Sequence, residues 1–109
     1  MSEIAYLLRL LAPGDKEAKV TAVTVTDTAT KFTSQLTEGY SRKHIKVYNN
    51  SDNSCHGCFY GFSSDITESN NSYPIPKGKE IIIPISTDID IYFVSCSGEV
   101  GDLRVEEIA

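Results

Sequence analysis

Tryptophan is absent from this chain of 109 residues, and cysteine, basic residues and long apolar runs are scarce. No stretch approaches the roughly 18 to 20 consecutive apolar residues of a membrane-spanning helix, and the N-terminus lacks the basic and apolar regions of a secretory signal. We therefore expect synthesis in the cytoplasm and no membrane partner. The formal net charge of −5 disfavours attraction to phosphate backbones, so nucleic acid is not an expected partner either.

The cysteines are Cys55, Cys58 and Cys96, an odd number in a chain without an export signal, which disfavours a disulfide framework. The stretch SCHGCFYGF raises three alternatives: half of a zinc site, a redox pair, or small apolar residues packing in a strand. A zinc site needs a second close pair of ligands, which the sequence does not offer. A redox pair begins a helix, whereas FYGF is typical of a strand. Packing is the favoured interpretation, and we expect no metal or other cofactor.

Signatures of catalysis are also missing. The chain has only two histidines, with no G-x-S-x-G elbow near them and no glycine-rich phosphate-binding loop. The acidic pairs Asp88 with Asp90 and Glu106 with Glu107 lie in or beside predicted strands, where alternation explains them as solvent-facing positions or strand ends. We therefore expect no enzymatic activity and assign no catalytic residue.

Strand-forming patterns begin at Lys19. The segment KVTAVTVTDTATKFT is rich in β-branched residues, and HIKVYNN alternates before a run of turn formers. In EIIIPIS, Pro84 cannot donate a hydrogen bond to a neighbouring strand, which predicts an edge strand or a bulge. Residues 63–79 between these segments form a long polar loop, with Tyr73 and Ile75 expected to point inward.

The last two predicted strands are IDIYFVSC and DLRVEEI. Alternation places Ile89, Ile91 and Phe93 together on one face of the first strand, and Leu103 and Val105 on the inner face of the second. We expect residues 98–101 to form a hairpin between them.

A short amphipathic helix is predicted at the N-terminus, because Ile4, Leu7, Leu8 and Leu11 follow its spacing and Pro13 with Gly14 end it. So short a helix must pack on its own domain or on a neighbouring subunit.

The fold that these elements predict is all-β: a single small β-sandwich or jelly-roll-like barrel of about 6 to 8 antiparallel strands. Residues 1–18 would form an N-terminal arm or short helix, and residues 19–109 the sandwich domain.

Several segments follow one another in a familiar order: TDTATKFT, LTEGYSRKHIKVYNNSDN, the pair Tyr60-Gly61, DITESNNSYPIPKGKEIIIPIS, DIDIYFVSCSG and DLRVEEIA. This order, from about residue 21 to the C-terminus, resembles small β-rich virion proteins of tailed bacteriophages. Among them it is similar to capsid decoration or cement proteins, such as the staple-type proteins on the heads of epsilon15-like podophages. The CHGC stretch departs from the family pattern, in which ordinary strand residues precede Tyr-Gly.

The resemblance implies a non-enzymatic virion structural protein, assembled in the host cytoplasm, that stabilises the capsid surface by binding the major capsid protein. It also implies a homo-oligomer, a dimer or a trimer. The expected partner contacts combine the leucine stripe, part of the one basic cluster and the long loop: Ile4, Leu7, Leu8, Leu11, Tyr40, Arg42, Lys43, Lys46, Tyr73 and Ile75.

Two alternatives remain open. The first is an accessory protein of the tail or of the head-to-tail connector, because the same segment order occurs in such proteins. The second is a carbohydrate- or receptor-binding β module, which Tyr48, Tyr60, Phe62 and Tyr73 suggest because all four lie near predicted loops.

Overall fold

The computed structural model describes residues 16–52 and 57–109. The predicted N-terminal helix, with Ile4, Leu7, Leu8 and Leu11, lies outside these residues, as do Cys55 and His56. The described residues contain strands and no helix: β1 (Ala18–Val25), β2 (Thr30–Lys31), β3 (His44–Asn49), β4 (Gly57–Gly61), β5 (Tyr73–Pro76), β6 (Glu80–Ile83), β7 (Tyr92–Ser95) and β8 (Gly101–Ile108). The expectation of an all-β fold is confirmed.

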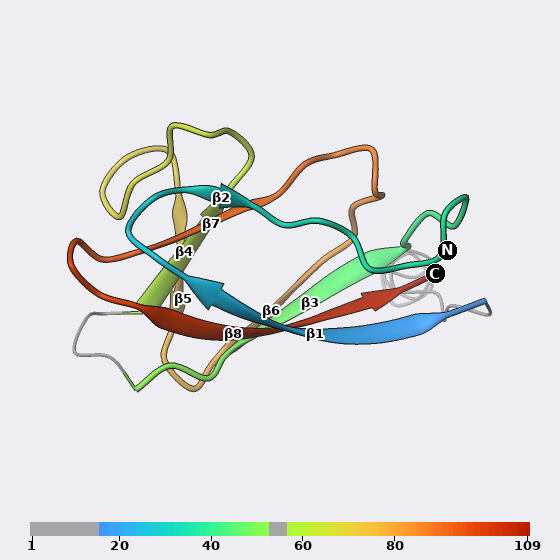
Figure 1. The fold of residues 1–109 in the computed structure, drawn as a ribbon, viewed down its shortest axis with the longest axis horizontal. Coiled ribbons are helices and arrows are strands. Elements are labelled where there is room, and N and C mark those ends of the chain that lie inside the picture. The colour runs from blue at the N-terminus through green and yellow to red at the C-terminus, as the bar shows by residue number, and fades with distance from the viewer. Residues whose placement is uncertain (1–15, 53–56) are drawn as a thin grey trace, which may run out of the picture.

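The strands form two antiparallel sheets, ordered β1-β8-β3-β6 and β2-β7-β4-β5 (Figure 1). Within them, β1 pairs with β8, β2 with β7, β3 with β6, and β4 with β5. This is the pairing of one long hairpin wrapped around a barrel, which is the arrangement of an eight-stranded jelly roll. The sequence predicted either a β-sandwich or a jelly-roll-like barrel, and the observed strand order is that of the jelly roll.

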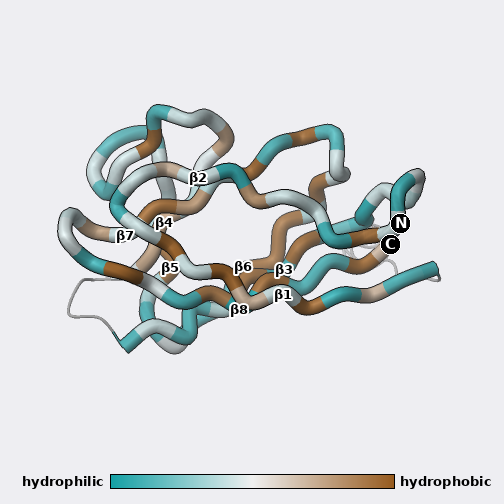
Figure 2. Tube along the Cα trace, viewed as in Figure 1, coloured by the Kyte–Doolittle hydropathy of each residue, from teal (hydrophilic) through white to brown (hydrophobic). Residues whose placement is uncertain are grey.

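The main core lies between the sheets because hydrophobic residues alternate with polar ones along the strands (Figure 2). Leu103 and Val105 of β8 are fully buried, as predicted, and Ile45 of β3 lies beside them. Ile75 of β5 and Phe93 of β7 face them from the other sheet. The alternation that the sequence displays therefore becomes the inner row of each sheet.

A second, smaller cluster covers the opposite face of the β2-β7-β4-β5 sheet. It joins Phe59 of β4 and Val94 of β7 to Ile66, which comes from the connection between β4 and β5. Gly61 lies beneath that connection, and a Cβ atom there would come within 2.5 Å of the Ile66 side chain. The long polar connection is thus packed onto the sheet by one isoleucine.

Four local expectations are wrong. Residues 63–79 are not one loop, because they contain the strand β5, which pairs with β4. The 98–101 segment is not a hairpin, because β7 pairs with β2 and β4 while β8 pairs with β1 and β3, so this segment joins the two sheets. Tyr73 is exposed, since it is the first residue of β5 and lies beyond the core that buries Ile75. Ile89 is exposed in the connection between β6 and β7, whereas Ile91 and Phe93 are buried as predicted.

The expectation for the strand before Pro84 is confirmed. β6 ends at Ile83 and is an edge strand, paired on one side only with β3. A proline directly after the strand does not interrupt any strand pairing at that position.

Candidate functional site

Glu107 is fully buried, although the sequence suggested a solvent-facing position. It follows Leu103 and Val105 on the inner row of β8, where alternation places every second side chain. Arg42 Nη1 donates to Glu107 Oε2 at 3.0 Å, Ser34 Oγ donates to the same oxygen at 2.7 Å, and the Gln35 backbone N–H donates to Oε1 at 2.9 Å. The buried carboxylate is therefore paired and hydrogen-bonded on both oxygens.

Arg42 is also buried, which corrects its assignment to a partner-contact surface. Besides the carboxylate, its guanidinium binds two backbone carbonyls: Nε donates to Ile85 O at 3.3 Å, and Nη2 donates to Ile89 O at 3.0 Å. One side chain thus ties the connection between β6 and β7 to β8. We interpret the pair as a structural lock, because each of its polar atoms already has a partner.

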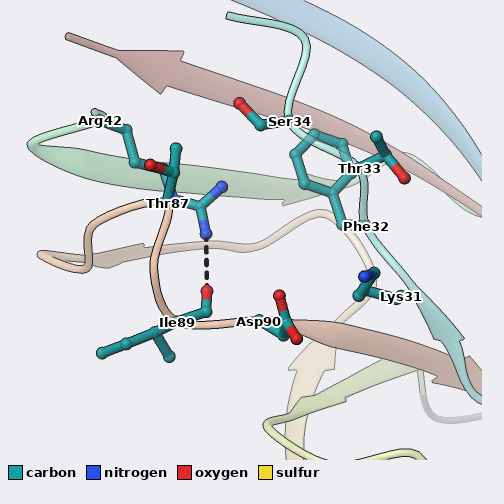
Figure 3. A pocket seen from close by; sticks show the side chains of 8 residues that line it. All are labelled: Lys31, Phe32, Thr33, Ser34, Arg42, Thr87, Ile89 and Asp90. Carbon is teal, nitrogen blue, oxygen red and sulfur yellow. Dashed lines mark hydrogen bonds between the residues drawn. The ribbon is translucent and has the colours of Figure 1, made fainter. Parts of the chain in front are cut away.

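A small cavity of about 140 Å³ lies beside this lock (Figure 3). Figure 3 shows the Arg42 guanidinium hydrogen-bonded to the Ile89 carbonyl on one side of the pocket, with the Phe32 ring on the other side. Pockets that bind drug-sized ligands are typically about 300 to 1,000 Å³, so this one is small. The residues that line it are Lys31, Phe32, Thr33, Ser34, Arg42, Thr87, Ile89 and Asp90.

Three aromatic side chains gather where β4 ends and β5 begins, and we call Tyr60, Phe62 and Tyr73 the aromatic patch. Tyr60 and Tyr73 are paired across the two strands, and their rings stack with centroids 5.9 Å apart and planes at 27°. The Phe62 ring meets Tyr60 edge-on at 6.0 Å and 78°. Tyr73 is 67% exposed and Phe62 is 49% exposed, so the patch presents ring surface to solvent.

The patch is an extension of the core. Tyr60 packs against the main cluster, and its partner on the other side is the buried Phe93 of β7. Burial, and secondarily Tyr73, raises the pKa of Tyr60, so its phenol stays protonated at neutral pH. Ile75 anchors the strand that carries Tyr73. The exposed rings therefore stand on a rigid support, which lowers the entropy cost of binding.

The basic residues among the expected contacts, Arg42, Lys43 and Lys46, do not form one positive surface. Tyr40 and Lys43 are exposed, in the segment between β2 and β3. Lys46 Nζ lies 4.0 Å from Glu80 and 3.8 Å from Glu106, so two carboxylates offset its charge. Arg42 precedes β3 and is buried, so it does not share a surface with these residues.

The predicted contacts accordingly divide into three groups. Tyr40, Lys43, Lys46 and Tyr73 are accessible to a partner, although Lys46 is half-buried. Arg42 and Ile75 are buried in the chain, which removes them from any contact surface. Ile4, Leu7, Leu8 and Leu11 lie outside the described residues.

The cysteines differ from one another. Cys58 is a free, fully buried thiol, and burial raises its pKa. Cys96 is disulfide-bonded, which corrects the expectation that the cysteines serve only as packing residues. Within residues 16–52 and 57–109, no group of three or more histidine, cysteine or acidic residues is arranged to hold a metal ion.

Compared with protein-family models, with curated proteins and with solved structures, the chain gives no significant match. In the part of the chain that the structure describes, no helix has the length and apolar character to cross a membrane.

Proposed function

We propose that this chain is a non-enzymatic structural protein of a tailed-phage virion that binds the major capsid protein on the capsid surface and stabilises the lattice. The observation that carries the proposal is the aromatic patch, a cluster of exposed rings on a rigid sheet end. Partner-binding energy is concentrated in such aromatic residues. We assign the patch, with Tyr73 at its most exposed point, as a principal capsid contact.

Two further features support this role. Jelly rolls recur in viral capsid domains, although a fold alone does not specify a function. The disulfide at Cys96 suits a protein that works outside a reducing cytosol, because disulfides persist on virion and cell surfaces. The proposed role does not require an active site. A cement protein needs contacts of modest strength that the capsid lattice repeats many times.

The proposal is tested with capsids of the source phage that lack this chain. We expect the purified protein to co-sediment with them and to saturate at a large fraction of the copy number of the major capsid protein. Removing the exposed ring in Tyr73→Ala should weaken binding roughly 30-fold, which is the effect of losing about 2 kcal/mol at a contact hot spot.

Tyr48→Ala is the matched control, because Tyr48 is an exposed tyrosine on β3 in the other sheet. We expect its capsid affinity to stay within about threefold of the parent, with both variants equally folded by circular dichroism. Absence of lattice binding by the parent overturns the proposal. Saturation at only a few copies per particle moves the protein to the tail or the connector.

A carbohydrate-binding function is the second candidate, and the same patch favours it. Stacked tyrosines offer flat apolar faces to a sugar ring, and lectin domains also use the jelly roll. A glycan array distinguishes the two functions. Binding to a glycan that is lost in Tyr73→Ala, together with no binding to capsids, would favour the carbohydrate module.

A further inference from the structure

Four strand edges flank the two sheets, and three of them are protected against pairing with another chain. β2 is two residues long. β5 carries Pro74 and Pro76, and β6 is four residues long and is followed by Pro84. Short edges and edge prolines are the usual means by which proteins prevent intermolecular strand pairing.

The fourth edge, β1, has none of these protections (Figure 1). It spans eight residues, AKVTAVTV, with no proline and only one charged residue, Lys19. Its valines and threonines favour extended structure. A strand of this length offers an edge of about 27 Å.

The hydrogen bonds at the start of β1 show which peptide groups are free. Glu17 and Ala109 exchange backbone hydrogen bonds in both directions, at 3.3 Å and 2.8 Å. Because hydrogen-bonded pairs alternate in an antiparallel ladder, Lys19, Thr21 and Val23 also direct their N–H and C=O groups toward β8. The intervening residues direct theirs away from the sheet, and all four have exposed side chains: Ala18, Val20, Ala22 and Thr24.

We propose that β1 pairs antiparallel with β1 of a second copy of this chain, about a two-fold axis at Thr21. In this register Ala18 lies opposite Thr24 of the second copy, and Val20 lies opposite Ala22 of the second copy. The outward N–H and C=O groups of Ala18, Val20, Ala22 and Thr24 then all find partners, which gives about eight hydrogen bonds between the copies. The two sheets join into one continuous sheet of twice the width.

The side chains of β1 are compatible with pairing to a second β1 strand. The two Thr21 side chains meet on the axis, and threonine pairs across strands are favourable. Lys19, the one charge in the strand, lies opposite Val23 of the second copy, so like charges do not face each other. Ala18 and Ala22 lie opposite Thr24 and Val20 of the second copy, so each of these pairs joins a small side chain to a larger one. An isologous two-fold interface is also the commonest way in which identical chains associate.

This inference deepens the proposed function by naming the surface that makes the homo-oligomer. It is tested without capsids, so its failure and the failure of capsid binding are distinguishable. The parent should sediment as a reversible dimer of twice 12.0 kDa.

Cysteine cross-linking of the full chain tests the register. In the proposed dimer, Thr21 lies opposite Thr21 of the second copy as a non-hydrogen-bonded pair. The two Cα atoms are then about 4.5 Å apart, which is within the range of a disulfide. We expect Thr21→Cys to form a covalent dimer under mild oxidation. Thr24→Cys is the matched control on the same strand, because its symmetry mate lies six positions along the pairing, about 20 Å away. Equal cross-linking of both variants, or of neither, overturns the proposed axis.

A charge at the edge tests the surface independently. In Val20→Lys the two new ammonium groups stand diagonally across the axis, and we expect the dimer dissociation constant to rise at least tenfold. Ile82→Lys is the control, because Ile82 is an exposed residue on the outer side of β6, at the opposite edge of the same sheet. Its dissociation constant should stay within twofold of the parent.

Three results overturn the inference. The first is a protein that stays monomeric at all concentrations. This result overturns the inference both when hydrogen exchange shows the β1 amides open to solvent and when another part of the chain protects them. The second is a trimer, which a two-fold strand pairing does not produce. The third is equal weakening of the dimer by Val20→Lys and Ile82→Lys.

Discussion

The buried ion pair between Arg42 and Glu107 provides the sharpest test of the fold. Replacing Glu107 by leucine leaves three donors without their acceptor: the buried Arg42 Nη1, the half-buried Ser34 hydroxyl and the N–H of the exposed Gln35. Removing one partner of a buried pair typically costs about 3 to 5 kcal/mol, because the other charge stays buried and unpaired. For a domain of this size, 1 kcal/mol corresponds to roughly 4 °C in Tm, so Glu107→Leu should lower Tm by about 12 to 20 °C.

The matched control is Glu106→Leu, one position earlier on the same strand. Glu106 lies on the outer face, where it pairs with Lys46 at 3.8 Å and both side chains are about one-third exposed. Surface pairs of this kind contribute less than about 1 kcal/mol, so this variant should lose less than about 4 °C. Differential scanning calorimetry measures both. Equal small losses would refute the assignment of Glu107 as the buried centre of the network.

The double variant Arg42→Met with Glu107→Leu separates the pair from its surroundings. Apolar replacement of a whole buried pair is often neutral. Here the Ile85 and Ile89 carbonyls also lose their donor, so some loss of stability should remain. We expect the double variant to lose at least about 2 kcal/mol less than the sum of the single losses, which is the coupling of residues in direct contact. Additive losses would show that the two charges do not interact.

Three further predictions concern the smaller cluster and the cysteines. Gly61→Ala places a Cβ atom 2.5 Å from the Ile66 side chain, so it should cost about 1 to 3 kcal/mol in chemical denaturation. Ser64→Ala, at an exposed position in the connection that follows β4, should have little effect, and equal losses would contradict the packing. Burial raises the pKa of Cys58 in the folded state, so its contribution to stability is complete below the unfolded pKa and is lost as the pH rises through the folded pKa. The stability advantage of the parent over Cys58→Ser, measured from denaturation midpoints, should therefore shrink at alkaline pH, and an advantage that stays constant or grows would contradict the sign. Because Cys96 is disulfide-bonded, the denatured, unreduced chain should show one reactive thiol, and three thiols before reduction would contradict the disulfide. Reduction of the folded protein should lower Tm.

Local patterns in the sequence predicted most of the strands, because burial on one face leaves a period of two that is visible in a single segment. The exception is β5, whose two prolines indicated a loop. Leu103 and Val105 were placed correctly on the inner row because of this period of two. The same period extends to Glu107, but the residue type argued for the surface and outweighed the pattern. Its partner, Arg42, is 65 positions away, and no local signal links the two. The lesson is that an acidic residue in phase with a core row indicates a buried partner elsewhere in the chain.

Which strands pair with one another cannot be predicted from the pattern of any single segment. Neighbouring strands usually pair, which is why residues 98–101 were expected to form a hairpin. In the jelly roll the first strand pairs with the last, so Ala18 lies opposite Ile108. The aromatic patch depends on the same kind of information: Tyr60 and Tyr73 become neighbours only when β4 and β5 are in register.

The placement of the two proposed surfaces has a consequence for capsid binding. β1 contacts β7 and β5 contacts β6, so the two sheets stack in the same strand order, with β1 at one side of the sandwich and β5 at the other. A dimer formed through β1 therefore leaves both aromatic patches free, at its two outer ends. Two patches on one rigid body bind a repeating lattice more tightly than one, because the second contact is intramolecular and gains from a high effective concentration. Val20→Lys should then weaken capsid binding although it leaves Tyr73 untouched, whereas the isolated affinity of each patch should stay the same.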